Sequence, residues 1–191
     1  MTTVAAIQGK NWVVMGADSQ STHGDRKIYM ADDKIVNNNG ILIAGCGSPR
    51  GTNLVQHIFK APKPVIGRTT EQLDKWMTSV FIPDLRQTFM DNGYDMKADG
   101  DFAQHDSEFL VAVQGIVYLV SDDYSWDRDV RGYMTSGSGG DYAQGVLFAS
   151  DDKIFTNLAE AKRAMKKAID AGKEFDSSSG GETKIYVQQA E

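Results

Sequence analysis

The sequence has little cysteine, no long apolar run and no cluster of positive charge. Its single cysteine, Cys46, cannot form an internal disulfide, which agrees with a reducing compartment. No stretch approaches the roughly 18 consecutive apolar residues that a membrane span needs, and the opening residues lack the charged and apolar regions of a signal peptide. We therefore expect a cytoplasmic protein that does not interact with a membrane.

The balance of charge argues against nucleic acid as a partner. The 26 Asp and Glu residues outnumber the 20 Lys and Arg residues, and the net charge is -6. No block of Lys and Arg offers the positive stripe that a phosphate backbone requires. The length of 191 residues and the hydrophobic content of 41% are ordinary for a globular protein with a sizeable core. We expect a single domain over residues 1–191.

Short β-rich runs occur in both halves of the chain, and turn-forming residues separate several of them. Gly9-Lys10-Asn11 and Gln114-Gly115 each lie between two such runs and predict hairpins. Another turn-prone stretch, Asn37 to Gly40, follows a run that contains Lys34, so we expect Lys34 within or beside a strand. The strands predicted in this way cover residues 3–8, 12–17, 28–36, 41–45, 109–113, 116–120, 132–136 and 184–188.

Apolar residues at spacings of three and four indicate helices. The spacing predicts helices around residues 54–58 and 73–80, with Pro83 kinking or breaking the second. A later helix carries an apolar stripe of Tyr142, Val146 and Ala149, and Asn157 is expected to cap the last helix, which has Lys and Arg on its outer face. Pairs of strands and pairs of helices indicate sheets packed on each other with helices outside.

The segment from Asp91 to Glu108 is acidic and contains two glycines. Such a composition is typical of a surface loop. Its Asp99-Gly100-Asp101 lacks the ligand spacing of a calcium-binding loop, so we expect no metal at this place.

Thr2 is the first residue that could carry chemistry. A small side chain at the second position permits removal of Met1, which would leave a hydroxyl and a free α-amine on one residue. That amine has a reference pKa of about 7.7 to 8.0 and can act as the base for the hydroxyl beside it. Taken alone, a threonine in this position most often carries no chemistry, so the prediction depends on residues elsewhere.

Lys34 and Asp18 are candidates for the groups that would support Thr2. A buried ammonium near Thr2 would favour the neutral amine and stabilise charge that forms on the hydroxyl oxygen. Lys34 can supply this ammonium, and Asp18, at the end of the second predicted strand, can hold it charged. Taken by themselves, the two residues are more often a structural salt bridge or two surface charges.

Two clusters of glycine and serine adjoin helical segments, one from Ser136 to Gly140 and one from Asp176 to Gly181. Either could be a plain loop. The first could also hold a phosphate at a helix N-terminus. It lacks the Lys-Ser/Thr ending of a P-loop, however, which argues against nucleotide binding.

Together these residues resemble the β-type subunits of the 20S proteasome and the simpler bacterial ATP-dependent protease rings, which are N-terminal nucleophile hydrolases. The resemblance covers nearly the whole chain. It implies an α+β fold, a four-layer αββα sandwich of two antiparallel sheets between helix layers. The motifs that carry it are Thr2-Thr3-Val4, Gly16-Ala17-Asp18, Asp33-Lys34-Ile35, Ala44-Gly45, Gly137-Ser138-Gly139-Gly140 and Asp176-Ser177-Ser178-Ser179-Gly180-Gly181.

The resemblance also implies a role for each matching residue. Thr2 is the nucleophile, and Lys34, oriented by Asp18, tunes the charge around it. The Gly45 N–H holds the oxyanion, although the segment after Lys34 is a few residues shorter than in typical proteasome subunits. Three more side chains support the active site, namely Ser138, Asp176 and Ser179. The residues expected to contact substrate side chains, with a preference for apolar ones, are Ile43 and Gly47.

Features at the two ends of the chain bear on the kind of subunit. The 176–181 motif favours proteasome β-subunits, whereas the single residue before Thr2 is closer to the simpler bacterial rings. The chain starts on a strand, without the N-terminal helix of α-type subunits. The resemblance implies a threonine endopeptidase that assembles with itself into a ring, acts on polypeptides and needs no metal or organic cofactor. Further partners would be an α-type ring or an ATP-dependent unfoldase.

Three other functions stay open on the sequence. A chain that keeps Met1 has its α-amine on the wrong residue and would be a catalytically silent structural or assembly protein of the same fold. The same Thr2 chemistry with another pocket would give an N-terminal nucleophile amidase for small amides. A thiol enzyme built on Cys46 and His57 has no supporting motif, and a buried structural cysteine is the simpler explanation.

Overall fold

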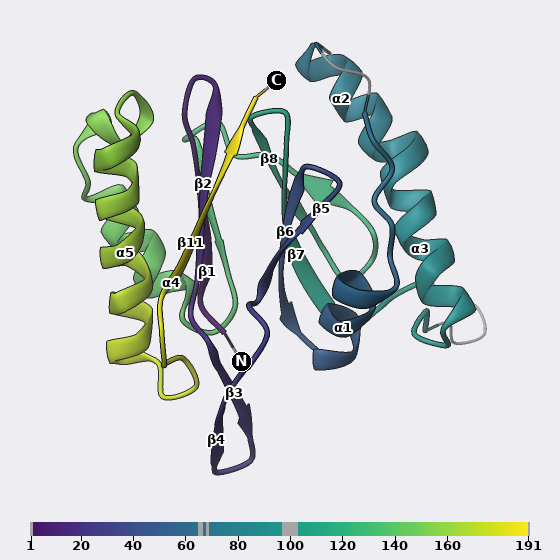
Figure 1. Cartoon of the computed structure of the whole chain (residues 1–191), viewed down its shortest axis with the longest axis horizontal. Coiled ribbons are helices and arrows are strands. Elements are labelled where there is room, and N and C mark those ends of the chain that lie inside the picture. The colour runs from purple at the N-terminus through teal and green to yellow at the C-terminus, as the bar shows by residue number, and fades with distance from the viewer. Residues whose placement is uncertain (1, 65–66, 68, 97–102, 191) are drawn as a thin grey trace.

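Two sheets stand face to face between two layers of helices in the computed structural model, which describes residues 2–64, 67, 69–96 and 103–190 (Figure 1). The four-stranded sheet has the order β10-β1-β2-β11 and the five-stranded sheet the order β5-β6-β7-β8-β9. The predicted α+β fold, an αββα sandwich, is thereby confirmed. The strands are β1 (Val4–Gln8), β2 (Trp12–Ala17), β5 (Ile35–Asn38), β6 (Ile41–Gly47), β7 (Ser107–Val113), β8 (Ile116–Val120), β9 (Trp126–Asp127), β10 (Tyr133–Ser136) and β11 (Lys184–Gln189).

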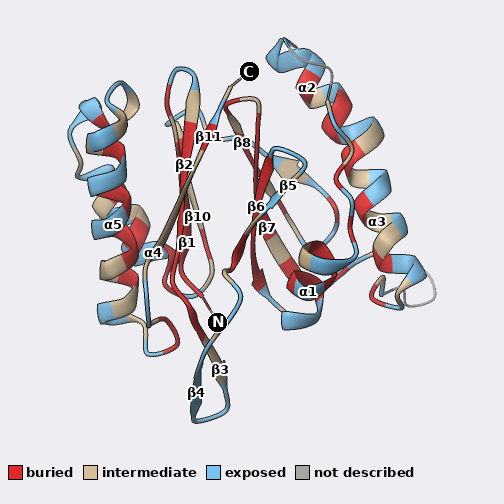
Figure 2. Ribbon diagram, in the orientation of Figure 1, coloured by how far each residue is buried: buried red, intermediate tan, exposed pale blue. Residues whose placement is uncertain are grey.

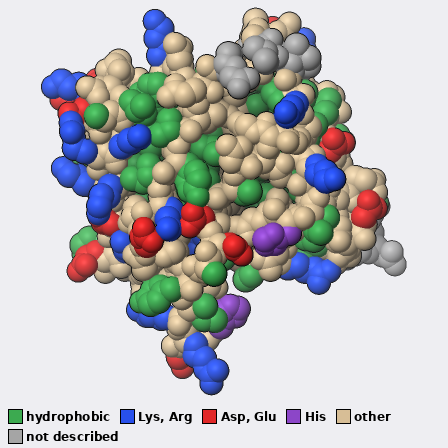
Figure 3. All heavy atoms as spheres, in the orientation of Figure 1, with side chains coloured by type: hydrophobic (Ala, Val, Ile, Leu, Met, Phe, Trp, Pro, Cys, Tyr) green, Lys and Arg blue, Asp and Glu red, His purple; other side chains and the backbone are tan. Residues whose placement is uncertain are grey.

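Each sheet carries helices on its outer face. The four-stranded sheet is covered by α4 (Gly140–Phe148) and α5 (Leu158–Phe175), which a 3-10 turn at Asp152–Phe155 separates. The five-stranded sheet is covered by α1 (Pro49–His57), α2 (Thr70–Trp76) and α3 (Ile82–Asp91). Asn157 caps α5, as predicted. Figure 3 shows basic side chains along the edge of the molecule where α5 lies, and Lys162, Arg163, Lys166 and Lys167 are exposed.

Alternation along the strands places every second side chain in a different core layer. In β1, Ala5 and Ile7 pack under α4 and α5, whereas Val4 and Ala6 face the other sheet. In β6, the odd-numbered Ile41 and Ile43 pack under α1 to α3, and the even-numbered Leu42 and Ala44 face the first sheet. Figure 2 shows the result as buried residues that run along the strands and the inner sides of the helices. Burial on both faces explains why these strands are apolar throughout.

The strand predicted over residues 28–36 is wrong. In the structure, β3 (Gln20–His23) and β4 (Arg26–Tyr29) form a hairpin that projects from the body of the molecule (Figure 1), and β5 begins only at Ile35. The N–H of Met30 donates to the Ser19 carbonyl at 2.9 Å at the base of this hairpin. Lys34 directly precedes β5, so the prediction that it lies beside a strand is confirmed.

The helix that was expected to kink or break at Pro83 instead contains a π-helical turn just before this residue. Residues Met77–Phe81 form a π-helical segment between α2 and α3, and the Ile82 N–H donates to the carbonyl of Met77. Pro83 then lies in the first turn of α3, directly after the π-helical segment, and it donates no backbone hydrogen bond to the preceding turn. The chain therefore stays helical past Pro83 by changing its hydrogen-bond register.

The buried face of α4 is offset by about one residue from the apolar stripe noted in the sequence. Ala143 and Leu147 are buried, while Tyr142 of the stripe is 45% exposed and Ala149 is also exposed. Tyr142 packs instead against Phe175 of α5, with ring centroids 5.6 Å apart. Two neighbouring stripes with the same helical spacing are both apolar here, and the spacing alone does not select between them.

The acidic segment before β7 is not wholly a surface loop. Asp99-Gly100-Asp101 lies outside the described residues, but Tyr94 and His105, on either side of it, are buried. Tyr94 donates to or accepts from the Ser107 hydroxyl at 2.8 Å, which ties the segment to the start of β7. No helix in the described part of the chain is long and apolar enough to cross a membrane.

His105 is enclosed by aromatic rings and is 1% exposed. The rings of Phe89, Tyr94, Phe109 and Tyr124 lie with centroids between 4.6 and 6.3 Å from its own. Neither imidazole nitrogen has a hydrogen-bond partner among the described residues. Burial lowers the pKa of His105 from 6.5 to about 4, against the opposing charges of the nearby carboxylates.

We predict that His105 makes the fold sensitive to acid. In the unfolded chain the imidazole takes up a proton near pH 6.5, whereas the folded protein resists protonation until about pH 4. The unfolded state therefore binds more protons in this window, and stability falls as the pH is lowered through it, by up to about 3 kcal/mol. Urea unfolding at a series of pH values measures the loss.

The matched variants are His105→Phe and His57→Phe. The first replaces the buried imidazole by a ring of similar size and should flatten the pH dependence. The second changes a histidine whose side chain is 59% exposed and should leave the wild-type slope unchanged. Equal slopes for wild type and His105→Phe would show that His105 does not cause the acid sensitivity.

Candidate active site

Thr2, Lys34 and Asp18 form a buried chain of hydrogen bonds. The Lys34 ammonium donates to the Thr2 hydroxyl oxygen at 2.9 Å and to Asp18 Oδ1 at 2.7 Å. The residues are 6%, 4% and 0% exposed, respectively. The three residues that sequence analysis grouped as nucleophile, ammonium and orienting carboxylate therefore lie in contact, in that order.

The ends of three strands bring these residues together. Thr2 lies just before β1, and Asp18 lies just after β2, which pairs with β1 so that Val4 is opposite Ala17. Lys34 lies just before β5, at the neighbouring edge of the second sheet. Figure 1 places the N-terminus between the two sheets, at the end from which the β3–β4 hairpin projects. The site is thus built at one end of the sandwich, where side chains of both sheets meet.

The Asp18 carboxylate accepts four hydrogen bonds. Its Oδ1 accepts from Lys34 and from the Thr3 N–H at 3.0 Å, and its Oδ2 accepts from the N–H groups of Gln20 at 3.1 Å and Gly180 at 2.9 Å. Two of these donors belong to residues near the start of the chain and one to the 176–181 motif. Asp18 therefore fixes the geometry of the site as well as the position of the ammonium.

The charge of Lys34 is set by two opposing effects. Burial lowers the pKa of Lys34 below its ordinary value of 10.5, while the charge and hydrogen bond of Asp18 raise it again in part. A lysine of this kind holds its proton less tightly than a surface lysine. In its protonated form it can stabilise negative charge on the Thr2 oxygen, which its ammonium contacts, and keep a nearby amine neutral.

A second group of polar residues lies beside the first. Ser138 and Ser179 both donate to Asp176 Oδ2, at 2.6 and 2.7 Å, and the Thr3 hydroxyl donates to the Ser179 oxygen at 2.7 Å. Burial alone would raise the pKa of Asp176, but the two serine hydroxyls outweigh it, and the pKa lies below its ordinary value. The structure thus joins the two Gly/Ser clusters around an ionised carboxylate.

Backbone contacts connect this second group to Thr2. The Gly139 N–H donates to the Thr2 carbonyl at 3.2 Å, and the Asp18 N–H donates to the Thr3 carbonyl at 3.1 Å. The start of the chain is therefore held from both sides. Every residue predicted to support the nucleophile, namely Asp18, Lys34, Ser138, Asp176 and Ser179, lies within this connected network.

The positions predicted to bind substrate differ from one another in their surroundings. The Gly45 N–H lies 3.4 Å from the Lys34 carbonyl, a long hydrogen bond, and a Cβ on Gly45 would come within 2.9 Å of Phe109. Ile43 is 2% exposed and packs in the core beneath α1 to α3. Gly47 lines a cavity next to the site. The oxyanion role of Gly45 and the substrate contacts of Ile43 and Gly47 stay predictions.

Thr3, Gln20 and Gly137 are parts of the site to which the sequence analysis assigned no role, although Thr3 and Gly137 lie within two of its motifs. Thr3 is 0% exposed although it is polar, and both its N–H and its hydroxyl bond to site residues. A polar residue directly before an apolar strand is the one sequence signal that could have marked it. Gln20 contacts Asp18 through its N–H and the Ser177 carbonyl through its amide.

Gly137 allows a close approach between its own segment and the start of the chain. It has a φ of +86°, and a Cβ there would lie 2.1 Å from the Thr2 carbonyl oxygen. We predict that Gly137→Ala displaces Thr2, lowers stability by about 2 kcal/mol and reduces any activity of the site. Thermal unfolding together with a peptide-cleavage assay measures both effects.

Gly145→Ala is the matched control for this variant. A Cβ on Gly145, within α4, would have no neighbour within 4 Å, so alanine should be neutral or slightly stabilising there. Should Gly137→Ala behave like Gly145→Ala in both assays, the close contact with Thr2 would have no structural importance.

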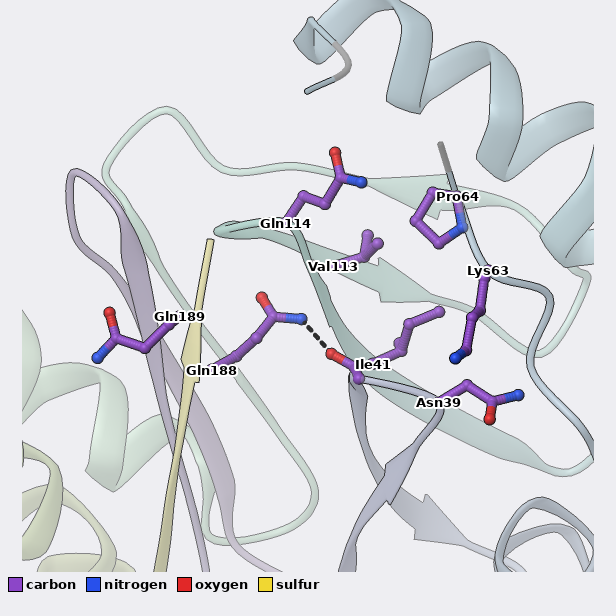
Figure 4. A pocket seen from close by; sticks show the side chains of 9 residues that line it. Asn39, Ile41, Lys63, Pro64, Val113, Gln114, Gln188 and Gln189 are labelled. Carbon is purple, nitrogen blue, oxygen red and sulfur yellow. Dashed lines mark hydrogen bonds between the residues drawn. The ribbon is translucent and has the colours of Figure 1, made fainter. Parts of the chain in front are cut away.

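Two cavities near opposite ends of the sandwich could bind a ligand. One of about 460 Å³ lies at the end remote from Lys34, by the turns at Gly40 and Gln114, and Figure 4 shows it lined by amide and apolar side chains and by Lys63. There the Gln188 amide donates to the Gly40 carbonyl at 2.8 Å. The other, of about 660 Å³, adjoins the network described above and is lined in part by Cys46, Gly47 and Ser138. Of these two cavities, only the second is lined by a residue that lies against Thr2, namely Gly137.

Neither a metal centre nor a thiol dyad emerges from the described residues. No group of three or more His, Cys, Asp or Glu side chains in the described ranges could hold a metal ion. Cys46 lies 2.8 Å from the Ser136 hydroxyl, whereas the His57 side chain is 59% exposed and 3.9 Å from Asp32. Burial raises the pKa of the Cys46 thiol, which disfavours the thiolate.

Comparison with known proteins gives matches only among solved structures. No protein-family model and no curated protein sequence matches the chain. The structure of BPH from Thiobacillus denitrificans is similar at a TM-score of 0.75 and 18% identity, over 99% of this chain and 98% of that one. BPH in complex with epoxomicin gives a TM-score of 0.73 at 18% identity, over 99% of both chains.

A third similar structure is the crystal structure of eukaryotic HslV from Trypanosoma brucei. It matches at a TM-score of 0.63 and 17% identity, over 98% of this chain and 99% of that one. The chain therefore shares the fold of BPH and HslV over essentially its whole length. The resemblance inferred from the motifs is confirmed as a resemblance of fold.

Proposed function

We propose that this chain is a threonine endopeptidase subunit that uses Thr2 as its nucleophile once Met1 has been removed. The observation that supports the proposal best is the contact of the Lys34 ammonium with the Thr2 hydroxyl at 2.9 Å and with Asp18 at 2.7 Å. A structural salt bridge would satisfy Asp18 and Lys34 without the threonine. Thr2 is held where the Lys34 ammonium can stabilise a developing alkoxide.

The proposed reaction proceeds in two steps. The Thr2 oxygen attacks the carbonyl carbon of a peptide bond, while the freed Thr2 amine takes the hydroxyl proton and passes it to the leaving amine. The products of this step are an ester on Thr2 and the C-terminal fragment. A water molecule, deprotonated by the same amine, then attacks the ester, releases the N-terminal fragment as an acid and restores the hydroxyl.

Other site residues would act on charge and position. Lys34 stabilises negative charge on the Thr2 oxygen, and Asp18 keeps the ammonium in place. The Gly45 N–H is the proposed oxyanion donor, which requires that it turn from its long 3.4 Å bond with the Lys34 carbonyl to the substrate. Ser138, Ser179 and Asp176 would hold the amine through the fixed backbone of Thr2 and Thr3.

The proposed assembly of the protein rests on its similarity in fold to BPH and HslV. We infer one domain that associates with itself into a ring in the cytoplasm and acts on polypeptides, with an α-type ring or an ATP-dependent unfoldase as a further partner. The match to BPH and HslV over nearly the full length of each chain supports this view. An enclosed chamber would keep such a nucleophile away from other proteins of the cell.

A comparison of two forms of the protein tests the proposed activity. One form is released from an N-terminal fusion partner that is cut off directly before Thr2, and the other retains Met1. We expect the first form alone to cleave a set of fluorogenic peptides, because only there does Thr2 carry the free amine. Failure of the Thr2-starting form to cleave any peptide or any small amide would contradict the proposal. Cleavage of small amides alone would point to an amidase.

A further inference from the structure

The cavity of about 660 Å³ beside Thr2 has a strongly acidic lining. Asp106, Glu108 and Asp122 contribute carboxylates, and no Lys, Arg or His is among the residues that line it. Within the described part of the chain, none of the three carboxylates takes part in an ion pair. The cavity therefore presents negative charge without a matching positive charge from the protein.

The cavity borders residues that lie next to the proposed catalytic machinery. Its wall includes Gly47, two residues after Gly45, and Ser138, which donates to Asp176. Gly137, whose backbone lies against the Thr2 carbonyl, also lines it. A substrate whose cleaved bond lies at the Thr2 oxygen would therefore place a neighbouring side chain at this cavity.

Of the three carboxylates that line the cavity, Glu108 is the one whose side chain accepts a hydrogen bond from across the sandwich. It lies on β7 of the five-stranded sheet, and the hydroxyl of Ser136, on β10 of the other sheet, donates to its Oε2 at 2.5 Å. Cys46 Sγ lies 2.8 Å from the same hydroxyl and 3.9 Å from Oε2. Glu108 is only partly exposed, so its charge is screened less than that of a surface carboxylate.

We propose that Glu108 is a specificity-determining residue, which selects substrates with a lysine or arginine side chain next to the cleaved bond. This inference rests on the proposed peptidase function and deepens it. It replaces the apolar preference predicted for Ile43 and Gly47, since Ile43 is enclosed in the core and Gly47 borders the acidic cavity. Asp106 and Asp122 add to the attraction for a cation by enlarging the negative field around Glu108.

A binding experiment tests the inference separately from catalysis. The Thr2→Ala protein, which starts at residue 2, is titrated with short fluorescein-labelled peptides in which arginine occupies each position in turn. Each peptide has a twin with citrulline, which has nearly the same shape without the charge. At one position we expect arginine to bind roughly tenfold more tightly than citrulline, and higher salt should weaken this preference.

The variant Glu108→Gln identifies the residue responsible. Glutamine keeps an acceptor for the Ser136 hydroxyl but removes the charge, so arginine and citrulline should then bind about equally, with the citrulline affinity unchanged. Asp152→Asn removes an exposed carboxylate from the 3-10 turn after α4 and should leave the preference intact. The inference is wrong if arginine and citrulline bind equally at every position, or if Glu108→Gln keeps the discrimination.

Cleavage by the Thr2-starting protein then separates the two claims. Cleavage of arginine peptides in preference to their citrulline twins supports both. A preference in binding without any cleavage supports the role of Glu108 and contradicts the peptidase function. Cleavage without preference contradicts the role of Glu108 alone.

Discussion

Replacing Thr2 by alanine in the Thr2-starting protein is expected to lower kcat/KM for peptide cleavage by roughly four orders of magnitude or more. Alanine removes the oxygen that forms the acyl-enzyme but leaves the α-amine, Lys34 and Asp18 in place. The fold should lose only the hydrogen bond from Lys34 to Thr2, which contributes about 1 kcal/mol. Peptide-cleavage kinetics and thermal unfolding of the same preparation measure the two effects.

Thr2→Ser is the matched control for this variant. Serine keeps both the hydroxyl and the amine, so it should retain a large part of the activity that alanine abolishes. Activity of Thr2→Ala close to that of the wild type would show that another residue is the nucleophile. A large loss of stability in Thr2→Ala would instead mean that the alanine variant reports on folding.

Asp18→Ala should have the largest effect on stability of any single change at the site. It leaves the Lys34 ammonium buried without its countercharge and removes the acceptor from the N–H groups of Thr3, Gln20 and Gly180. Breaking a buried ion pair in this way costs about 3 to 5 kcal/mol. Without Asp18 the Lys34 pKa should fall further, so activity should be lost as well. Urea unfolding at a fixed protein concentration measures the change.

Asp32→Ala is the control for Asp18→Ala. Asp32 lies close to Lys34 in the sequence, but its side chain is 70% exposed and its one ion pair, with His57, spans 3.9 Å. Its replacement should change stability by no more than about 0.5 kcal/mol. Equal effects of the two variants would show that the buried network contributes little to the fold.

Local sequence signals were sufficient for much of the fold. The hairpins at Gly9-Lys10-Asn11 and Gln114-Gly115 were predicted because turn residues and flanking β-rich runs act over a few positions. The helix capped by Asn157 was predicted for the same reason. The prediction of one strand over residues 28–36 failed because the two ends of this run belong to different strands. β4 pairs with β3 in a separate hairpin, whereas β5 pairs with β6.

The long-range contacts of the site could not be predicted from local sequence patterns. Thr2, Asp18 and Lys34 were grouped by their resemblance to a family, and the structure then gives their contacts. The link from Thr3 to Ser179 joins residues 176 positions apart, and no local pattern encodes such a pairing. Likewise, the aromatic surroundings of His105 and the charge of the Glu108 cavity arise only when distant strands and helices meet.

The central claim is that Thr2 acts with its own free amine, and the intact mass of the protein purified from its native host tests it most directly. The account predicts a mass lower than that of the encoded chain by one methionine residue, with Thr2 as the first residue in N-terminal sequencing. Retention of Met1 in the native protein would contradict it, because the amine would then belong to the wrong residue.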